Sequence, residues 1–204
     1  MSPAMRKRTK EAAASLERRA VMRALVADRD DDLLVVPGLG STNYDLAAAG
    51  DHPLNFYLWG AMGGAALIGL GLALAQPRKR VLVVTGDGEM LMGVGGLATI
   101  AVQQPRNLAI AVIDNERYAE TGLQRTHTAY GVDLAGIAAA AGFESAHTVR
   151  SERELAAAVP LLRGAPGPVF ATIKVRPDRP PFVLPEKDAV EIKNRFRRAL
   201  LGAI

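Results

Sequence analysis

Residues 80–89 read RVLVVTGDGE, and this stretch decides the fold. The unbroken apolar run 81–84 is typical of a strand that is buried on both faces of a parallel sheet. Gly86-Asp87-Gly88 then ends the strand, and a helical pattern follows over 89–102. Glycines allow a sharp turn and close approach of a ligand, and free N–H groups at a helix start bind anions. The turn is therefore either a phosphate-binding loop or only a tight strand-to-helix connection.

The next strand ends on a second polar pair. Residues 108–114 (LAIAVID) form another buried run, and Asn115 follows it, 28 positions after Asp87. If the two strands are adjacent and parallel, Asp87 and Asn115 lie side by side. A carboxylate, an amide oxygen and a loop carbonyl are ligands that Mg²⁺ prefers together with phosphate oxygens. The two loops predict a magnesium–diphosphate site, and Leu91 rules out the dinucleotide fingerprint G-x-G-x-x-G.

Strands alternate with helices along most of the chain. Strands are expected at 33–36, 80–85, 108–114, 144–149 and 169–175, and helices at 10–27, 62–75, 89–102, 133–141, 151–162 and 185–201. This order predicts an α/β fold: a doubly wound, mainly parallel sheet with helices on both faces. Ligands bind such sheets at the carboxyl ends of the strands. The loops expected there are 38–43, 86–89 and 115–118.

Composition and charge exclude several classes of protein. The chain has 204 residues, is 49% hydrophobic and contains no cysteine, which leaves no disulfide scaffold, cysteine-ligated zinc or thiol nucleophile. Its net charge of +4 comes from the two ends, 1–25 and 174–204, while the middle is acidic. No nucleic-acid-binding motif accompanies the basic ends, so they read as solvated or partner-facing helices. The basic start is not followed by an apolar segment, which indicates no signal peptide and a cytoplasmic protein.

One apolar stretch requires a membrane check. Residues 56–75 (FYLWGAMGGAALIGLGLALA) carry no charge and are long enough to span a bilayer. Their glycines weaken an isolated helix, and the stretch leads through a short basic turn into the strand at 81–85. A buried helix packed on the sheet is the favoured interpretation, with a membrane span as the alternative.

The residues around both loops resemble a known family. Gly86-Asp87-Gly88 and a later asparagine, each ending a strand, resemble the thiamine diphosphate-binding motif. The flanking segments 55–101 (NFYLWGAMGGAALIG…) and 108–138 (LAIAVIDNERYAETGLQRTHTAYG…) look like the β subunits of sulfopyruvate and phosphonopyruvate decarboxylases. The resemblance covers about 33–175, and it implies that 56–75 is an interior segment.

The resemblance implies a role for each matching position. Asp87 and Asn115 would be Mg²⁺ ligands, with the backbone carbonyl of Arg117 as the third. The carbonyl of Gly60 would accept from the aminopyrimidine of thiamine diphosphate, and Met62, otherwise an ordinary core residue, would prop the bent cofactor. The other expected cofactor-binding positions are Gly86, Gly88, Glu89 and Tyr118, together with a second phosphate loop at Gly40, Ser41 and Thr42 whose alternative is a helix cap.

The chain departs from the family pattern on the loop beside the cofactor. It has Asn115-Glu116 where the family has Asn-Gly, and Thr121-Gly122-Leu123-Gln124 where the family has Thr-Gly-Gly-Gln. These changes affect the expected substrate more than the expected cofactor. On the same loop, Glu120 is a candidate acid near the substrate or else a solvated carboxylate. His127 is a candidate for orienting the substrate or else incidental.

Half of the implied active site is missing from this chain. Activation of the cofactor in this family needs a glutamate from a separate pyrimidine-binding domain, and 1–32 is too short to supply one. We therefore expect an N-terminal basic helix (1–32), a diphosphate-binding domain (33–176) and a proline-rich arm with a C-terminal helix (177–204). A pyrimidine-binding α subunit would complete a hetero-oligomer such as α2β2 or larger.

The implied reaction is decarboxylation of a small 2-oxo acid to CO₂ and an aldehyde. The same residues would serve a carboligase or lyase subunit resembling acetolactate synthase, and the sequence does not separate the two outcomes. A nucleotide-binding oxidoreductase domain is a further alternative, disfavoured by the missing glycine fingerprint. A small membrane-anchored interaction protein is the remaining one.

Overall fold

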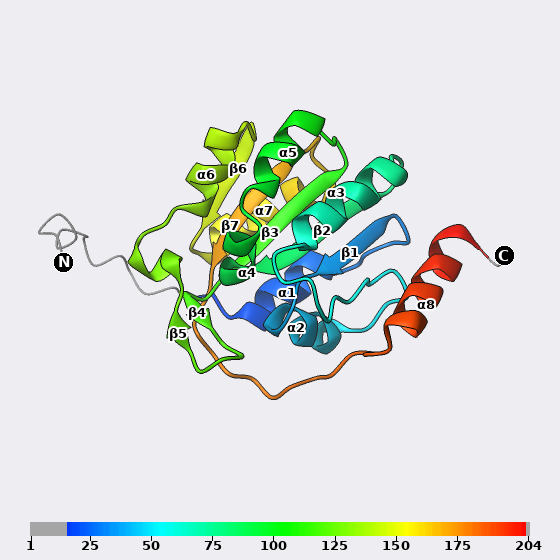
Figure 1. Ribbon diagram of the computed structural model, residues 1–204, viewed down its shortest axis with the longest axis horizontal. Coiled ribbons are helices and arrows are strands. Elements are labelled where there is room, and N and C mark those ends of the chain that lie inside the picture. Colours follow the sequence, from blue (N-terminus) through cyan, green and yellow to red (C-terminus); the bar gives the residue numbers. More distant parts are fainter. Residues whose placement is uncertain (1–15, 203–204) are drawn as a thin grey trace, which may run out of the picture.

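A five-stranded parallel sheet forms the centre of the computed structural model, which describes residues 16–202. The strand order is β1-β2-β3-β7-β6, and every neighbouring pair is parallel. The sheet strands are β1 (Leu33–Pro37), β2 (Arg80–Gly86), β3 (Leu108–Asp114), β6 (Ser145–Val149) and β7 (Val169–Lys174). Figure 1 shows them side by side with helices in front and behind. The predicted doubly wound α/β fold is confirmed.

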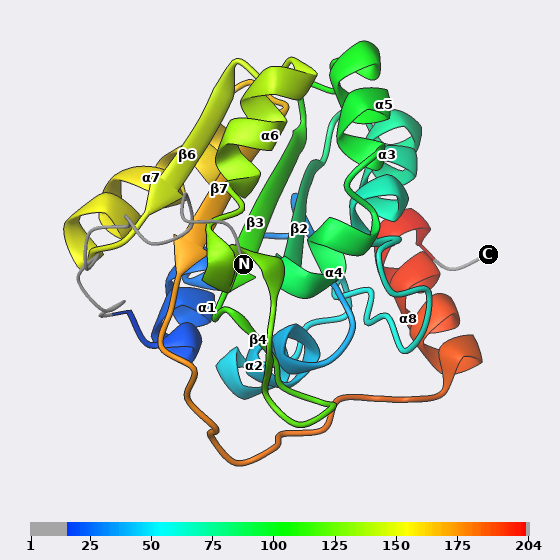
Figure 2. The same ribbon diagram turned by 60° about the vertical axis from the view of Figure 1, so that its left-hand side comes forward.

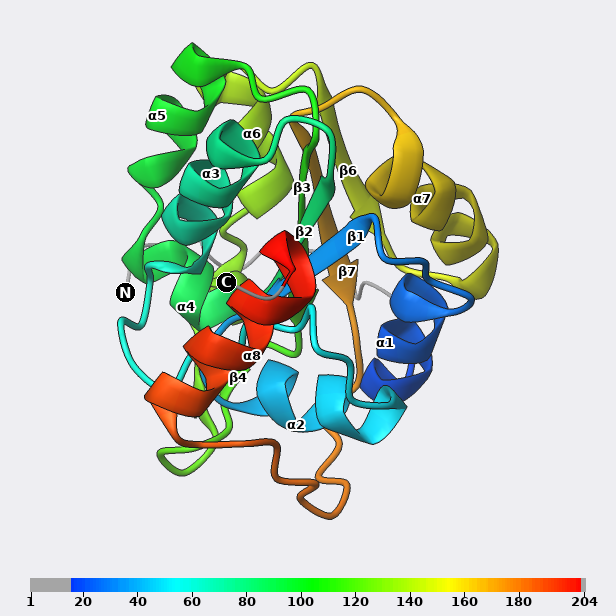
Figure 3. The same ribbon diagram turned by 90° about the vertical axis from the view of Figure 1, so that its right-hand side faces the viewer.

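Two layers of helices cover the sheet, one on each face (Figure 3). One layer contains α3 (Ala65–Ala75), α4 (Asp87–Met92), α5 (Gly96–Gln103) and α6 (Leu134–Ala141). The opposite face carries α1 (Arg18–Val26), α2 (Ser41–Ala49) and α7 (Glu152–Gly164). Alternate residues of each strand enter the two cores, as in β1, where Leu33 and Val35 face one core and Leu34 and Val36 face the other. Strands β1, β2, β3 and β7 are therefore mainly apolar on both faces, whereas β6 is partly exposed.

Local capping signals fix several helix ends. Ser151 and Glu154 form a capping box at the start of α7. Asp133 caps α6 through the N–H of Gly136, and Gly142, in the left-handed conformation, ends that helix. The prediction that Ser41 or Thr42 caps α2 is wrong, because Gly40 is the N-cap and no side chain caps this helix.

Three helices differ from their predicted bounds. The helix expected at 62–75 begins only at Ala65, because Ala61 and Gly63 both have left-handed φ angles, 56° and 93°. The helix expected at 89–102 is broken between α4 and α5, where Gly93 lies against the backbone of Gly63 so closely that a Cβ would overlap it. The C-terminal helix α8 (Ala189–Leu201) begins four residues later than expected, with Asp188 as its N-cap.

The segment 115–130, where no helix or strand is expected, contains regular structure. It forms a small antiparallel hairpin from β4 (Arg117–Tyr118) and β5 (Gln124–Arg125), followed by the 3₁₀ helix η2 (His127–Tyr130). Local pairing of this kind satisfies backbone groups that would otherwise need water.

A fourth helix is also shorter than expected: of the basic helix predicted at 10–27, the structure shows α1 from Arg18, with Glu17 as its N-cap and Leu16 bridged to Val175. The part predicted before residue 16 lies outside the described residues.

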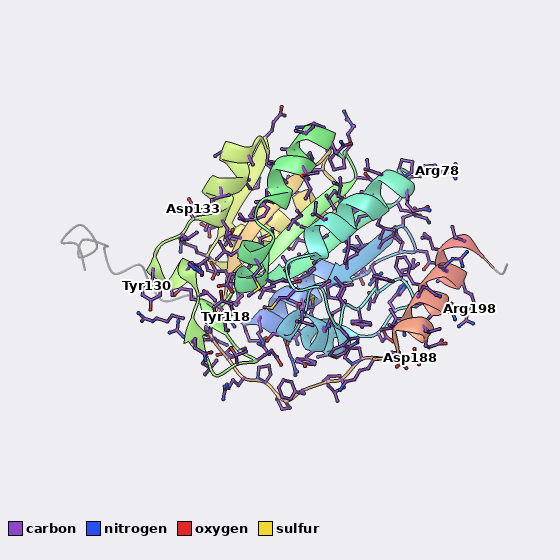
Figure 4. All side chains as sticks on the ribbon, in the orientation of Figure 1. Arg78, Tyr118, Tyr130, Asp133, Asp188 and Arg198 are labelled. Atoms are coloured by element: carbon purple, nitrogen blue, oxygen red, sulfur yellow. The ribbon has the colours of Figure 1, made fainter. Side chains whose placement is uncertain are left out.

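The arm after β7 runs past the ends of α1 and α2 to α8 (Figure 2). The Nε1–H of Trp59 donates to the carbonyl of Glu186 (2.7 Å), and Arg195 pairs with Asp51 (2.6 Å). The ring of Phe196 packs edge-on against the ring of Phe56, with 5.2 Å between the ring centroids. The arm and α8 therefore cover the 51–59 segment. In Figure 4 the labelled Asp188 is the N-cap of α8, and the labelled Arg198 lies in its last turn.

Within residues 16–202, no helix combines the length and the apolar character needed to cross a bilayer. The helix in the apolar stretch 56–75 is α3, with only 11 residues. Its buried residues Ala65, Ala66, Leu70 and Ala73 belong to one of the two sheet cores, as the buried-helix interpretation expects.

Candidate functional site

A cleft of about 190 Å³ lies at the carboxyl edge of the sheet. The ends of β2 and β3 form its floor, because Gly86 pairs with Ile113 in the parallel register. The start of α2, the start of α4 and the hairpin loop form its walls. Tyr118, labelled in Figure 4, belongs to the hairpin wall. The cleft therefore gathers the three loops that the sequence placed at this edge of the sheet.

Asp87 is buried at the bottom of the cleft. Its Oδ2 accepts hydrogen bonds from the hydroxyls of Thr126 (2.5 Å) and Thr128 (2.9 Å). Burial, with the nearby charge of Asp114, raises the pKa of Asp87 to about 6. Both hydroxyls use Oδ2, so they leave Oδ1 available as a hard oxygen ligand.

Asp114, at the end of β3, shares this polar cluster. It accepts from the hydroxyl of Thr128 (2.9 Å) and from Lys174 Nζ (2.9 Å) at the end of the adjacent β7. Lys174 also contacts Glu116 Oε1 at 2.7 Å. Burial opposes the charge of Lys174, but the two carboxylates outweigh burial and raise its pKa. The lysine therefore balances the acidic strand ends and ties the loop after β3 to the sheet.

The loop after β3 contains both departures from the family pattern, Glu116 and Leu123. The side-chain oxygen of Asn115 accepts from the N–H of Arg117 (2.9 Å), a local turn that brings both residues into the cleft wall. Glu116 and Leu123, the two residues that stand where the family has glycine, have left-handed φ angles of 60° and 62°. Side chains at such angles cost about 1–2 kcal/mol. The ion pair of Glu116 with Lys174 offsets part of this strain.

The glycines of the turn after β2 have different requirements. A Cβ on Gly88 would lie 2.3 Å from the ring of Tyr118, so the fold itself needs glycine there. A Cβ on Gly86 or on Gly60 would meet no described atom within 4 Å, and neither residue has a left-handed φ. The fold thus leaves open space above Gly86 inside the cleft, beside the oxygens of Asp87 and Asn115. Open space and hard oxygen donors are compatible with a diphosphate and Mg²⁺.

Glu89 directs its carboxylate away from this space. The hydroxyl of Thr85 donates to Oε2 (2.7 Å), and a Cβ on Gly38 would overlap the same oxygen. Burial raises the pKa of Glu89, although hydrogen bonds to the carboxylate oppose that shift. Glu89 therefore joins the loop after β1 to α4, and its backbone N–H is the group available to a ligand.

The structure brings most of the expected residues together. Those that line the cleft are Gly40, Ser41, Thr42, Met62, Gly86, Asp87, Gly88, Glu89, Asn115, Arg117, Tyr118 and Glu120. Gly60 and His127 are not among the lining residues, and both are exposed. Met62 is 44% exposed, so its interpretation as an ordinary core residue is wrong. Thr42 lies buried beneath the loop, with its hydroxyl donating to the carbonyl of Gly38 (2.8 Å).

Sequence reasoning missed three groups at the site. Thr126 and Thr128, which donate to Asp87, stand immediately before and after His127, and this pair of threonines two residues apart was the available signal. Arg18 of α1 also lines the cleft. No motif marked this arginine, because it is distant in sequence from every other lining residue.

Comparison with known proteins identifies the class. Residues 39–173 match the family model described as thiamine pyrophosphate enzyme, C-terminal TPP binding domain. This match covers more than half of the chain, and the chain therefore belongs to that family. The resemblance stated from the two motifs is confirmed.

Individual relatives show which members are similar. The chain is 42% identical over 176 residues to a protein named sulfopyruvate decarboxylase subunit beta, from Methanothermobacter thermautotrophicus, covering 85% of this chain and 90% of that one. It is 38% identical to phosphonopyruvate decarboxylase from Streptomyces viridochromogenes, covering 91% of this chain but only 46% of that one. Benzoylformate decarboxylase from Polynucleobacter necessarius shares the fold, with a TM-score of 0.68 at 20% identity over 85% of this chain and 36% of that structure.

The first prediction concerns Asp87. We expect Asp87→Asn to keep the buried hydrogen bonds with Thr126 and Thr128, and so to remain folded, while it loses the charge that holds a cation. Mg²⁺-dependent affinity for thiamine diphosphate should fall by more than about a hundredfold. Loss of a residue that only hydrogen-bonds a metal ligand usually costs about tenfold to a hundredfold. Isothermal titration calorimetry measures this, with the helix-cap variant Asp133→Asn as a control. Binding as tight as that of the wild type would contradict the metal assignment.

The second prediction separates the two glycines of the turn. Gly86→Ala places a methyl group in open space, so the free energy of unfolding should change by less than about 1 kcal/mol, while binding of thiamine diphosphate is lost. Gly88→Ala must displace Tyr118 and should destabilise the protein by about 1–3 kcal/mol. Chemical denaturation and calorimetry on both variants check this. Undiminished binding by Gly86→Ala would show that no ligand occupies the space above that residue.

Proposed function

We propose that this chain is the diphosphate- and Mg²⁺-binding subunit of a heteromeric thiamine diphosphate-dependent 2-oxo acid decarboxylase. The observation that carries the proposal is the meeting of Asp87 and Asn115 at one cleft, beside the open space over Gly86, in a chain of this family. The proposed division into 1–32, 33–176 and 177–204 follows the same reasoning. We also propose that the enzyme works in the cytoplasm.

The residues of this chain would hold the cofactor rather than supply the reacting groups. Asp87 and Asn115, with the carbonyl of Arg117, would bind Mg²⁺. The backbone N–H groups of the first turns of α2 and α4 would bind the diphosphate. When bound, thiamine diphosphate supplies the electron sink for loss of CO₂ from the 2-oxo acid. Met62 would support the bent cofactor, since its exposed side chain lines the cleft.

Two observations support a separate partner subunit. Glu89 is the only buried glutamate among residues 16–202, and its carboxylate is held by Thr85 beneath the loop after β1. Exposed apolar side chains also lie on the α3–α5 layer, namely Leu67 and Met92, and Met62, just before α3, lines the cleft. A pyrimidine-binding subunit seated there would bury this surface and bring the activating glutamate. An α2β2 or larger assembly is part of this proposal.

The substrate proposal rests on the relatives. Their names specify sulfopyruvate and phosphonopyruvate, and we propose a small 2-oxo acid of this type. Glu120, at the mouth of the cleft, would face such a substrate. His127 stays a weaker candidate, because the structure places it outside the cleft lining. Product analysis separates the decarboxylase from the carboligase alternative: the first releases an aldehyde, and the second joins it to another carbonyl compound.

The third prediction is that the isolated chain is folded but catalytically silent. With thiamine diphosphate and Mg²⁺, it should not decarboxylate sulfopyruvate, phosphonopyruvate or pyruvate, because the activating glutamate is absent. Addition of a pyrimidine-binding partner should restore release of CO₂, and Asp87→Asn in the same complex should not. Steady turnover by the isolated chain would contradict the split site and point to a glutamate of this chain, such as Glu120.

The fourth prediction concerns Met62. Because this side chain is already 44% exposed, Met62→Ala should change the free energy of unfolding by less than about 0.5 kcal/mol. In the assembled enzyme, kcat should fall because the cofactor loses its support. Leu161→Ala removes a comparably exposed apolar side chain (36%) of α7, on the opposite face of the sheet and outside the cleft lining, and it is the matched control. An unchanged kcat for Met62→Ala would remove this residue from the site.

A further inference from the structure

Arg18 occupies an unusual place for a charged residue. It is the first residue of α1 and only 4% exposed, yet it lines both the cleft and a second hollow beneath the arm at 178–182. Helices α1 and α2 lie side by side in Figures 1 and 3, which places the start of α1 near the phosphate loop that opens α2. Ser41 of that loop lines the same two hollows.

The protein does not neutralise this arginine fully. Arg18 Nε lies 2.9 Å from Asp45 Oδ2, but the buried Nε makes no aligned hydrogen bond. The same carboxylate pairs with Arg19 Nε at 3.2 Å, so two guanidinium groups share one carboxylate. Among the described residues, none accepts a recorded hydrogen bond from the Arg18 guanidinium. A buried cation with unused donors is costly unless an anion pairs with it.

Arg19 uses its remaining donors differently. Its guanidinium donates to the carbonyl of Pro181 in the arm, and Arg19 lines neither hollow. One member of this arginine pair therefore fastens the arm, and the other faces the cleft.

Only a basic side chain of the cleft could pair with an anion there. Two basic residues line it, Arg18 and Arg117. Arg117 already donates from Nη1 to the carbonyl of Glu116 (2.8 Å). Arg18 donates no recorded side-chain hydrogen bond to a described residue, and it lines the cleft together with Ser41 of the phosphate loop.

We propose that Arg18 binds the terminal phosphoryl group of thiamine diphosphate. This inference rests on the proposed function and adds a side chain to the expected backbone groups of the two loops. A guanidinium suits the role because its fixed donors match phosphoryl oxygens and it keeps its charge when buried. Asp45 would orient the guanidinium from behind.

The test compares ligands that differ by one phosphoryl group. Calorimetry on the enzyme assembled with its pyrimidine-binding partner, in excess Mg²⁺, would measure the affinity of thiamine diphosphate and thiamine monophosphate. Arg18→Met should weaken diphosphate binding by about tenfold to a hundredfold, weaken monophosphate binding much less, and be partly rescued in Arg18→Lys. Arg19→Met, which removes the other partner of Asp45, is the matched control and should change either affinity by less than about twofold.

Further outcomes would overturn the inference. If Arg18→Met fails to fold, the double variant Arg18→Met/Asp45→Asn is used in its place in the same titrations. The second substitution removes the carboxylate that the first leaves without its arginine partner. Unchanged diphosphate affinity in folded Arg18 variants, or equal losses in the Arg18 and Arg19 variants, would make Arg18 purely structural. A raised KM for the 2-oxo acid with unchanged cofactor affinity would assign Arg18 to the substrate's anionic group. No binding of thiamine diphosphate by the wild-type complex would contradict the proposed function itself.

Discussion

Two carboxylates, Asp87 and Asp114, lie buried at the ends of adjacent parallel strands, and the surrounding structure is arranged to keep them there. Loss of water and the nearby charge of Asp114 disfavour the charged form of Asp87. Thr126 and Thr128 supply hydroxyl donors, and Lys174 supplies a positive charge from the next strand. This cluster joins β2, β3, β7 and the loop that leads to η2. A cation bound at Asp87 would add to this balance, so metal binding and local order are expected to depend on each other.

The sheet could be predicted from the sequence because each central strand is an apolar run that both helix layers cover. The strand ends were equally readable, since Gly86-Asp87-Gly88 and Asn115 interrupt those runs sharply. Residues grouped within these loops therefore met at the cleft as expected. Contacts between segments far apart in sequence could not be predicted, because no local pattern marks them. Arg18 reaches the cleft only because α1 packs beside α2, and neither helix carries a motif for that contact.

Helix boundaries were less predictable where backbone conformation, rather than hydrophobic pattern, decides. Composition continues smoothly through Met62, but Ala61 and Gly63 are left-handed and postpone α3. Gly93 breaks the following helix because another backbone crosses it. The same limit applies to Glu116 and Leu123: the sequence showed that they replace glycines, and only the structure shows that both keep the glycine-like φ. Two positions thus adopt a backbone conformation that favours glycine although neither of them is glycine.

Trp59 gives the molecule a spectroscopic property. It is the sole tryptophan of the chain, it directly precedes Gly60, and its indole donates to Glu186 at the far end of the arm. Its ring also lies 6.1 Å from Tyr44 of α2 and beneath the ammonium group of Lys187, at 5.4 Å. Indole emission therefore comes from a single environment, at the junction of the arm with the segment that leads to Met62. Changes in its wavelength or anisotropy would report directly on whether the arm is seated, without any introduced label.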